Sequence, residues 1–331
     1  MGTRRFAMVM RAAVLAAFLA SAAAGGVFDG WGYRARLSFF QPLDGPLANF
    51  PVLIVLGTNV PGFQYSDCET DGGDLRFADS NETAALNYEI EKWDPSGESF
   101  VWVQVPLLES TNDFIYMYWF RATSAAPCNT NGDAWDASAR AVWHLSEPGG
   151  ATYRDSTANA NAGTKGGGTT PAAGRIGGAQ SFDGVGDYID FASPDSLDVA
   201  QPRTVSAWIR PAALVNYGAV IGKDSQRSGA SYSYMMCCHG DGALIAYDGG
   251  TWRPSANLGV TAGQWYHVAY ETLGDGWIRY YLNGLLRGSN LWSHADNTNH
   301  SVYMGSWYAP GTGYDFNGVI DEGRIEAVAR G

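Results

Sequence analysis

Residues 264–287, QWYHVAYETLGDGWIRYYLNGLLR, constrain the fold more strongly than any other stretch of this 331-residue chain. Two runs rich in aromatic and β-branched residues, 265–271 and 277–282, are separated by Gly-Asp-Gly, and Asn-Gly follows the second run. Asn-Gly provides the two positive φ angles of a tight two-residue turn, so the stretch predicts two β-hairpins that share a strand. Both faces of residues 265–271 are largely apolar. Because alternate side chains point to opposite faces, we expect this strand to be buried between two layers.

The composition extends the β prediction to the whole chain. The sequence has 42 glycines and 13% aromatic residues, with few segments of helical periodicity. This is typical of an all-β protein with many tight turns. Short strand candidates bounded by Gly, Pro, Asn or Asp follow one another in both halves. We predict two antiparallel β-sandwich modules, because the length suits two domains that each have their own core.

The first 24 residues have the pattern of a secretory signal peptide. Three arginines precede an apolar run at residues 12–20, and small residues that suit signal peptidase follow at 21–24. The alternative is a membrane anchor, but the run is too short to span a bilayer core of roughly 30 Å. We expect cleavage after Ala24 and export to the periplasm, the cell surface or the extracellular space, with no membrane insertion after cleavage.

The charge balance argues against two classes of partner. The formal net charge is −12, it becomes more negative when the leader is removed, and the sequence has no run of Lys and Arg. A nucleic acid or an anionic membrane surface is therefore not an expected partner.

The four cysteines fall into two groups. Cys68 and Cys128 both lie in the first half, and since export permits disulfides we expect them to be joined. Cys237 and Cys238 are adjacent, and a bond between them would strain the intervening peptide. On a strand their side chains point to opposite faces, so we expect two buried thiols.

Three motifs in the first half carry a family resemblance. FPVL at 50–53, DLRF at 74–77 and YEIE at 88–91 resemble a bacterial family known as domain of unknown function 2341. The resemblance implies a β-sandwich module over residues 25–125 of an exported envelope protein, and it brings no established activity. Small and polar residues at 126–139 then predict a linker.

A second resemblance covers residues 140–331. AVWHL at 141–145, SAWIRP at 206–211 and VIDEGRI at 319–325, with the hairpins at 264–287, resemble the laminin-G-like branch of the concanavalin A-like lectin/glucanase jelly rolls. The resemblance implies non-catalytic carbohydrate binding or adhesion at the bacterial cell envelope, with a glycan or a cell-surface protein as partner. Two alternatives stay open: a glycoside hydrolase that acts on a polysaccharide, and a structural spacer or protein-interaction module.

The hydrolase alternative depends on the acids of EIEKWD, which are Glu89, Glu91 and Asp94. Laminarinase-like enzymes of this fold carry E-x-D-x-x-E on one strand, with acids at the same spacing. Residues two apart on a strand are about 6.5 Å apart, close to the separation of about 5–5.5 Å between the carboxyl groups of a retaining pair. A bulge would be needed to bring Asp94 to the same face. The location in the first module and the shorter third side chain favour a solvated acidic strand face instead.

Calcium is the cofactor that the second resemblance implies. Related jelly rolls bind one ion with the aspartate of the closing strand, which corresponds to Asp321 here, and Asp155 and Asp183 are further oxygen donors in glycine-rich loops. Hard cations prefer six to eight oxygen ligands, which loops and a terminal strand together supply. The alternative is that these aspartates cap turns by accepting hydrogen bonds from their own backbone.

Four aromatic residues lie beside loop-forming residues and are candidate glycan contacts: Trp252, Trp292, Trp307 and Tyr308. A sugar ring stacks its apolar face on an exposed aromatic ring, while nearby polar groups bind its hydroxyls. The alternative is burial, because most tryptophans are largely buried in cores or under loops. The sequence thus predicts a weak glycan site on the second module, supported by calcium.

Overall fold

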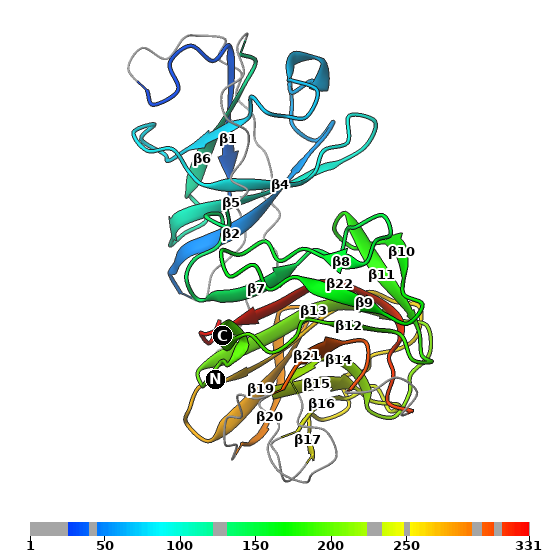
Figure 1. Ribbon diagram of the computed structural model, residues 1–331. Helices are drawn as coiled ribbons and strands as arrows, with labels where there is room; N and C mark the ends of the chain where they lie inside the picture. The colour runs from blue at the N-terminus through cyan, green and yellow to red at the C-terminus, as the bar shows by residue number, and fades with distance from the viewer. Residues whose placement is uncertain are drawn as a thin grey trace. The chain divides into compact units, whose positions relative to one another are not determined.

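The structure is a computed structural model that describes residues 26–39, 45–121, 131–223, 234–247, 252–292, 300–307 and 313–330. Within these ranges the chain forms 22 strands and two 3-10 helices, η1 (Tyr65–Asp67) and η2 (Asp195–Leu197). The prediction of an antiparallel all-β fold is confirmed (Figure 1). No helix in the described ranges is long and apolar enough to cross a membrane. The predicted signal peptide lies outside the described residues.

The chain divides into two compact units, with the boundary between Asp136 and Ala137. The first unit has two three-stranded antiparallel sheets. One has the order β1 (Tyr33–Ser38), β6 (Phe114–Trp119), β3 (Arg76–Ala78), and the other β2 (Leu47–Leu56), β5 (Ser99–Leu108), β4 (Tyr88–Lys92). Strand β2 contains the apolar run FPVLIVL, whose residues 52–54 are fully buried. Such a run buries both faces of the strand and forms the centre of the core.

The first sheet of the second unit contains eight strands and ends at the predicted hairpins. Its order is β10 (Thr170–Ala173), β11 (Gly178–Asp183), β22 (Asn317–Glu326), β13 (Arg203–Pro211), β18 (Tyr266–Thr272), β19 (Trp277–Leu282), β20 (Leu285–Leu291), with β7 (Ala139–Trp143) paired to β22. The Asn283-Gly284 turn has φ angles of 51° and 77°, as the tight-turn prediction requires. Strand β18 is buried on both faces, with Tyr270 in the main core and Ala269 in a separate cluster.

The second sheet of this unit also contains eight strands. Its order is β17 (Trp252–Pro254), β16 (Leu244–Tyr247), β15 (Tyr234–Cys238), β14 (Gly218–Lys223), β21 (Val302–Met304), β12 (Tyr188–Asp190), β9 (Gly163–Gly166), β8 (Thr152–Tyr153). The main core draws residues from both sheets, as in a jelly roll. Trp143 of β7 is fully buried within it and stacks on Phe191 with 3.8 Å between ring centroids.

The cysteines are arranged as follows. Cys238 belongs to the main core and Cys237 to a cluster on the opposite face of β15, so the prediction of two buried side chains on opposite faces is confirmed. Cys68 is half-buried with a free thiol, and its burial raises the thiol pKa. Cys128 lies outside the described residues, so the predicted disulfide stays a prediction.

Part of the predicted linker at 126–139 is packed rather than extended. Its described portion begins at residue 131, and Trp135 is buried against Trp102 of the same unit, with 5.4 Å between ring centroids. At the other end, Ala139 already begins strand β7. The small and polar residues of this segment suggested a linker. They outweighed the one tryptophan, Trp135, whose ring packs the segment against the sandwich.

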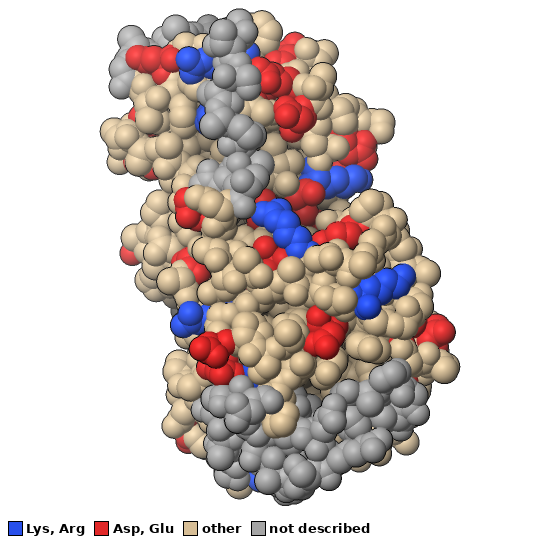
Figure 2. All heavy atoms as spheres, viewed as in Figure 1, with Lys and Arg blue, Asp and Glu red and all other residues tan. Residues whose placement is uncertain are grey.

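Acidic side chains are spread over the face drawn in Figure 2, and basic side chains are few. This agrees with a chain that has 33 Asp and Glu residues against 21 Lys and Arg.

Candidate functional site

The second sheet of the second unit is apolar on both of its faces. On β15 the residues Tyr234, Met236 and Cys238 face the main core, whereas Met235 and Cys237 face away from it. The outward-facing residues join those of neighbouring strands in a separate buried cluster: Ala219, Met235, Cys237, Ile245 and Trp307. An antiparallel sheet with one solvated face normally carries polar residues there, so this apolar outer face needs an explanation.

Five aromatic rings cover that cluster and form what we call the aromatic patch: Tyr217, Tyr247, Trp252, Trp307 and Tyr314. Trp252 lies at its centre, with ring centroids 4.4 Å from Tyr217, 4.7 Å from Tyr247 and 5.2 Å from Trp307. All but Trp307 are half-buried, and Trp307 is 9% exposed. The patch therefore presents ring surface to solvent while its inner rings are held by the sheet.

Tyr217 has an unusual backbone conformation. Its φ is +60°, immediately before β14 begins at Gly218. A bulky side chain rarely occupies the left-handed region, and holding it there costs about 1–3 kcal/mol. Contacts around Tyr217 must offset the cost of this backbone conformation. One of them is the contact between the Tyr217 and Trp252 rings.

A polar pair borders the patch. The His239 ring lies 4.9 Å from the Tyr217 ring, and its Nδ1 is 2.9 Å from Oδ1 of the exposed Asp241. Hydrogen bonds from His239 and from the backbone N–H of Ala243 lower the pKa of Asp241. The patch thus combines aromatic rings with a carboxylate and an imidazole. Aromatic rings stack on the faces of sugars, and polar groups of this kind bind sugar hydroxyls.

Two of the four predicted aromatic contacts meet in this patch, namely Trp252 and Trp307. Trp292 was predicted wrongly, because it is only 4% exposed and belongs to the main core beside Tyr270. Tyr308 lies outside the described residues. Sequence reasoning missed Tyr217, Tyr247 and Tyr314. The signal for the site was the doubly apolar strand YMMCC, which indicates a sheet face covered by something other than the main core.

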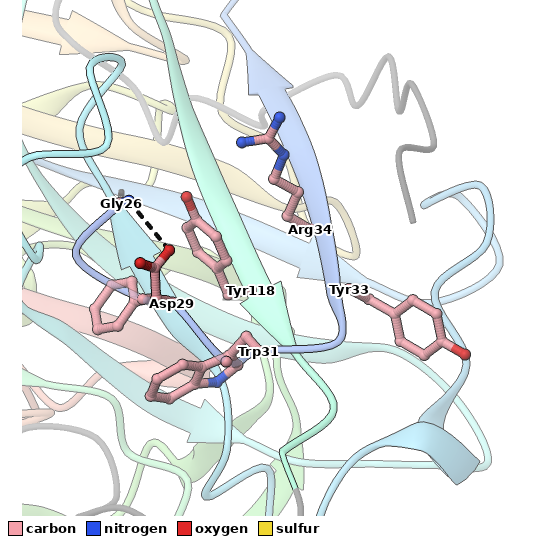
Figure 3. A pocket seen from close by; sticks show the side chains of 8 residues that line it. Gly26, Asp29, Trp31, Tyr33, Arg34 and Tyr118 are labelled. Atoms are coloured by element: carbon pink, nitrogen blue, oxygen red, sulfur yellow. Dashed lines mark hydrogen bonds between the residues drawn. The ribbon is translucent and has the colours of Figure 1, made fainter. Parts of the chain in front are cut away.

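The first unit has a surface hollow of its own (Figure 3). Its walls include Phe28, Asp29, Trp31, Arg34 and Tyr118. The Phe28 ring makes edge contacts with Trp31 and Tyr118, with centroid distances of 5.0 and 5.3 Å. The sequence motifs did not point to this hollow, because its residues come from the start of the described chain and from β6.

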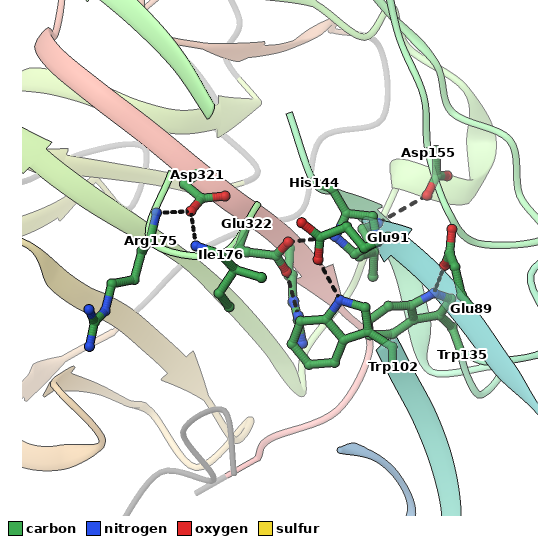
Figure 4. A network of polar contacts seen from close by, with 12 residues as sticks. Glu89, Glu91, Trp102, Trp135, His144, Asp155, Arg175, Ile176, Asp321 and Glu322 are labelled. Atoms are coloured by element: carbon green, nitrogen blue, oxygen red, sulfur yellow. Dashed lines mark hydrogen bonds and ion pairs between the residues drawn. The ribbon is translucent and has the colours of Figure 1, made fainter. Parts of the chain in front are cut away.

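The predicted calcium ligands each accept hydrogen bonds from protein donors, and Figure 4 shows Asp155 and Asp321. Asp155 accepts the N–H groups of Val142, Thr157 and Asn161 at 2.9–3.0 Å, and also the Thr157 hydroxyl at 2.9 Å. Oδ2 of the fully buried Asp321 accepts the N–H groups of Arg175 at 2.6 Å and Ile176 at 2.9 Å.

Asp183 accepts the N–H of Val185 at 2.7 Å, in the turn-capping arrangement. The three carboxylates thus accept hydrogen bonds from three separate sets of donors. Among the described residues, their oxygens do not form a group close enough together to hold one ion. A calcium ion requires several oxygens that converge on one point, so this donor set does not fit the ion.

Two of the three acids of the hydrolase alternative, Glu89 and Glu91, accept hydrogen bonds from tryptophan indoles in the first unit (Figure 4). Oε2 of Glu89 accepts the indole N–H of Trp135 at 2.9 Å, and Oε2 of Glu91 accepts that of Trp102 at 2.8 Å. The pairing of β4 with β5 shifts its register between Ile90 and Lys92. Asp94 is used in a turn instead, where donors from Lys92 and Ser96 lower its pKa to about 2. The arrangement gives each acid a structural partner.

The architecture defines a concanavalin A-like sandwich preceded by a smaller β unit, and family models match both. Residues 183–330 match the laminin-G-type model of the concanavalin A-like lectin/glucanases superfamily, and residues 71–135 match domain of unknown function 2341. The chain therefore carries a region of domain of unknown function 2341 followed by a concanavalin A-like domain, in the predicted order. Among curated protein sequences, none matches this chain.

Solved structures are similar to this chain over different shares of its length. Domain 4 of AbnA, a GH43 extracellular arabinanase from Geobacillus stearothermophilus solved with arabinotriose, is 24% identical over 58% of this chain and 95% of that domain, with a TM-score of 0.44. The binding domain of Paraclostridial Mosquitocidal Protein 1 is 13% identical over 58% of this chain and 49% of its own, with a TM-score of 0.45. Trypanosoma rangeli sialidase in complex with sialic acid is 11% identical over 95% of this chain and 51% of its own, with a TM-score of 0.46. This chain thus spans about half the length of the latter two.

Proposed function

We propose that this chain is an exported, non-catalytic protein of the bacterial cell envelope whose second unit binds a saccharide on the aromatic patch. The observation that carries the proposal is the outward face of β14–β17, where five rings replace the polar side chains expected of a solvated sheet face. Four of these rings are half-buried and keep part of their surface accessible, and contiguous accessible apolar surface marks a binding site or an interface. The match to a lectin-containing superfamily agrees with the first of these.

The chemistry of the patch favours a sugar over a flat protein partner. The rings are tilted or perpendicular to one another rather than coplanar, with interplanar angles of 33° to 69° around Trp252. This geometry gives a small stepped surface beside the polar His239–Asp241 pair. One shallow site of this kind buries few atoms, so we expect dissociation constants on the order of millimolar to micromolar.

Replacing Trp252 with alanine is expected to weaken saccharide binding at least about tenfold, or about 1.4 kcal/mol, because it removes the central ring. Calorimetric titration of the full chain with neutral β-glucan, galactan and xylan hexasaccharides measures the effect. Trp277→Ala is the matched control, since Trp277 is 42% exposed on β19 of the other sheet. Equal loss in both variants, or no binding of any probe at millimolar concentration, would contradict the proposal.

Replacing Tyr217 with glycine or asparagine is expected to reduce saccharide binding while changing the free energy of unfolding by less than about 1 kcal/mol. Both residues tolerate φ near +60°, so relief of backbone strain offsets the lost ring contacts. Urea unfolding and the same titration are run side by side. A variant that loses several kcal/mol of stability, or that binds like the wild type, would show that the strained tyrosine serves only the fold.

A further inference from the structure

The sheet β1-β6-β3 of the first unit separates its side chains into an apolar inner face and an arginine-rich outer face. On β1, Ala35 and Leu37 are buried, whereas Arg34 and Arg36, which alternate with them, are partly exposed. The register places Arg34 opposite Tyr118 and Arg36 opposite Tyr116 of β6. Paired residues share a face, so arginines and tyrosines alternate across the outer surface of this sheet.

Besides the buried Arg76, which lies 5.6 Å from the Trp31 ring centroid, three partly exposed arginines of the first unit lie over aromatic rings. The guanidinium carbon is 3.9 Å from the Phe114 ring centroid for Arg36, 5.1 Å from that of Tyr116 for Arg34, and 4.1 Å from that of Trp31 for Arg121. We call these residues the arginine–aromatic strip. The planar guanidinium group stacks on rings and still presents its N–H groups at the edge.

The strip adjoins the hollow of Figure 3, and both share Trp31 and Arg34. The Trp31 indole donates a hydrogen bond to the Asp74 carbonyl at 2.7 Å. The Asp74 carboxylate accepts the backbone N–H of Arg121 at 3.2 Å. Asp74 therefore fixes both the ring and the arginine that lies over it, which is the behaviour of a preformed site.

The charges of the strip are only partly neutralised. Arg34 pairs with Glu82, which also accepts the Tyr118 hydroxyl at 2.5 Å. Among the described residues, neither Arg36 nor Arg121 takes part in an ion pair, although the stretch 26–121 has 14 Asp and Glu residues against five Lys and Arg. Two unpaired arginines in so acidic a unit retain donors that suit a bidentate carboxylate or sulfate.

We propose that the arginine–aromatic strip binds an anionic saccharide, whose sugar ring carries a carboxylate or a sulfate. The rings would stack on the sugar, and Arg36 and Arg121 would bind the anion. The alternative of a nucleic acid is disfavoured, because phosphate-driven affinity needs many cations with little competing negative charge. This site lies in the first unit and does not depend on the saccharide site proposed for the second.

The test compares sugars that carry anionic groups with a matched sugar whose carboxylates are esterified. The full chain is titrated with tetragalacturonic acid, with its methyl ester, with a chondroitin sulfate tetrasaccharide and with a ten-nucleotide oligothymidylate. We expect the acid or the sulfated sugar to bind at least about tenfold more tightly than the neutral ester, and the affinity to fall as salt rises. If the carboxylate sugar binds and the sulfated one does not, or the reverse, the source of the anion is identified.

The variant Arg36→Gln with Arg121→Gln is expected to lose at least about tenfold in affinity for the anionic sugar. Lys92→Gln is the matched control, because Lys92 is paired with Asp94 and lies outside the strip. Neutral-sugar binding at the aromatic patch should be unchanged in the double variant, so failure of one proposal is distinguishable from failure of the other. Equal binding of acid and ester, unchanged affinity in the double variant, tighter binding of the oligothymidylate, or no binding of any probe would overturn the proposal.

Discussion

Replacing Asp321 with alanine is expected to lower the free energy of unfolding by about 3–5 kcal/mol. The carboxylate is fully buried on β22 and accepts the N–H groups of Arg175 and Ile176. Its removal leaves the buried N–H of Ile176 without this acceptor, at about 1–3 kcal/mol, and the partly buried N–H of Arg175 at a smaller cost. Urea unfolding of the full chain measures the loss.

The Asp321 variants also separate a hydrogen-bonding role from the calcium role that the resemblance implied. Asp321→Asn keeps an oxygen that accepts N–H groups, so it should lose clearly less stability than Asp321→Ala. Calcium and a chelator should leave the melting temperature of the wild type and both variants unchanged. A wild-type melting temperature that rises with calcium, together with loss of that rise in both variants, would show that Asp321 is an ion ligand after all.

Acidification from pH 6.5 to pH 4.5 is expected to destabilise the protein through His267, by about 1.4 kcal/mol for each pH unit. Burial lowers the pKa of this histidine to about 3, with a further contribution from the charge of Arg324, while Glu322 opposes the shift. The unfolded chain takes up the proton near the ordinary pKa of 6.5 and the folded chain does not. Stability is therefore lost as the pH falls below 6.5. The pKa of buried Glu322 is lowered by His144 and Arg324 despite its burial, so it adds a further loss below pH 4.5.

The matched variants for this pH dependence are His267→Gln and His300→Gln. His267→Gln should flatten the dependence of unfolding free energy on pH between 6.5 and 4.5, although it lowers stability at neutral pH. His300 is far less buried, and its replacement should leave most of the slope in place. Urea unfolding at half-unit pH intervals makes the comparison. An unchanged slope in His267→Gln would mean that other groups carry the acid sensitivity.

Local patterns predicted much of the fold. The Asn-Gly turn and the doubly apolar strand at 265–271 are determined by residues close in sequence, and the structure has the hairpins where they were expected. The motifs at 141–145, 206–211 and 319–325 likewise lie on β7, β13 and β22, which are paired in one sheet. The residues of a tight turn and the alternation of side chains along a strand are close together in the sequence, so one sequence is enough to predict them.

The candidate sites were less predictable because they depend on long-range register. Trp252 and Trp292 both stand beside loop-forming residues, yet one lies on the outer patch and the other in the main core. Nothing within a few residues of either distinguishes them. Arg121 of the strip is far in sequence from Arg34 and Arg36, and it joins them only because β1 pairs with β6 and the chain then reaches Arg121. The net charge of the whole chain is negative, so it gives no sign that these three arginines lie together.

The most direct test of the proposed saccharide site is the indole N–H spectrum of the full chain during titration with whichever neutral hexasaccharide binds. The 12 tryptophans give separate signals that single Trp→Phe variants assign. Trp252 and Trp307 should shift with one common dissociation constant, while Trp277, Trp292 and Trp31 stay unchanged. Shifts confined to tryptophans outside the aromatic patch, at concentrations where calorimetry shows binding, would contradict the account.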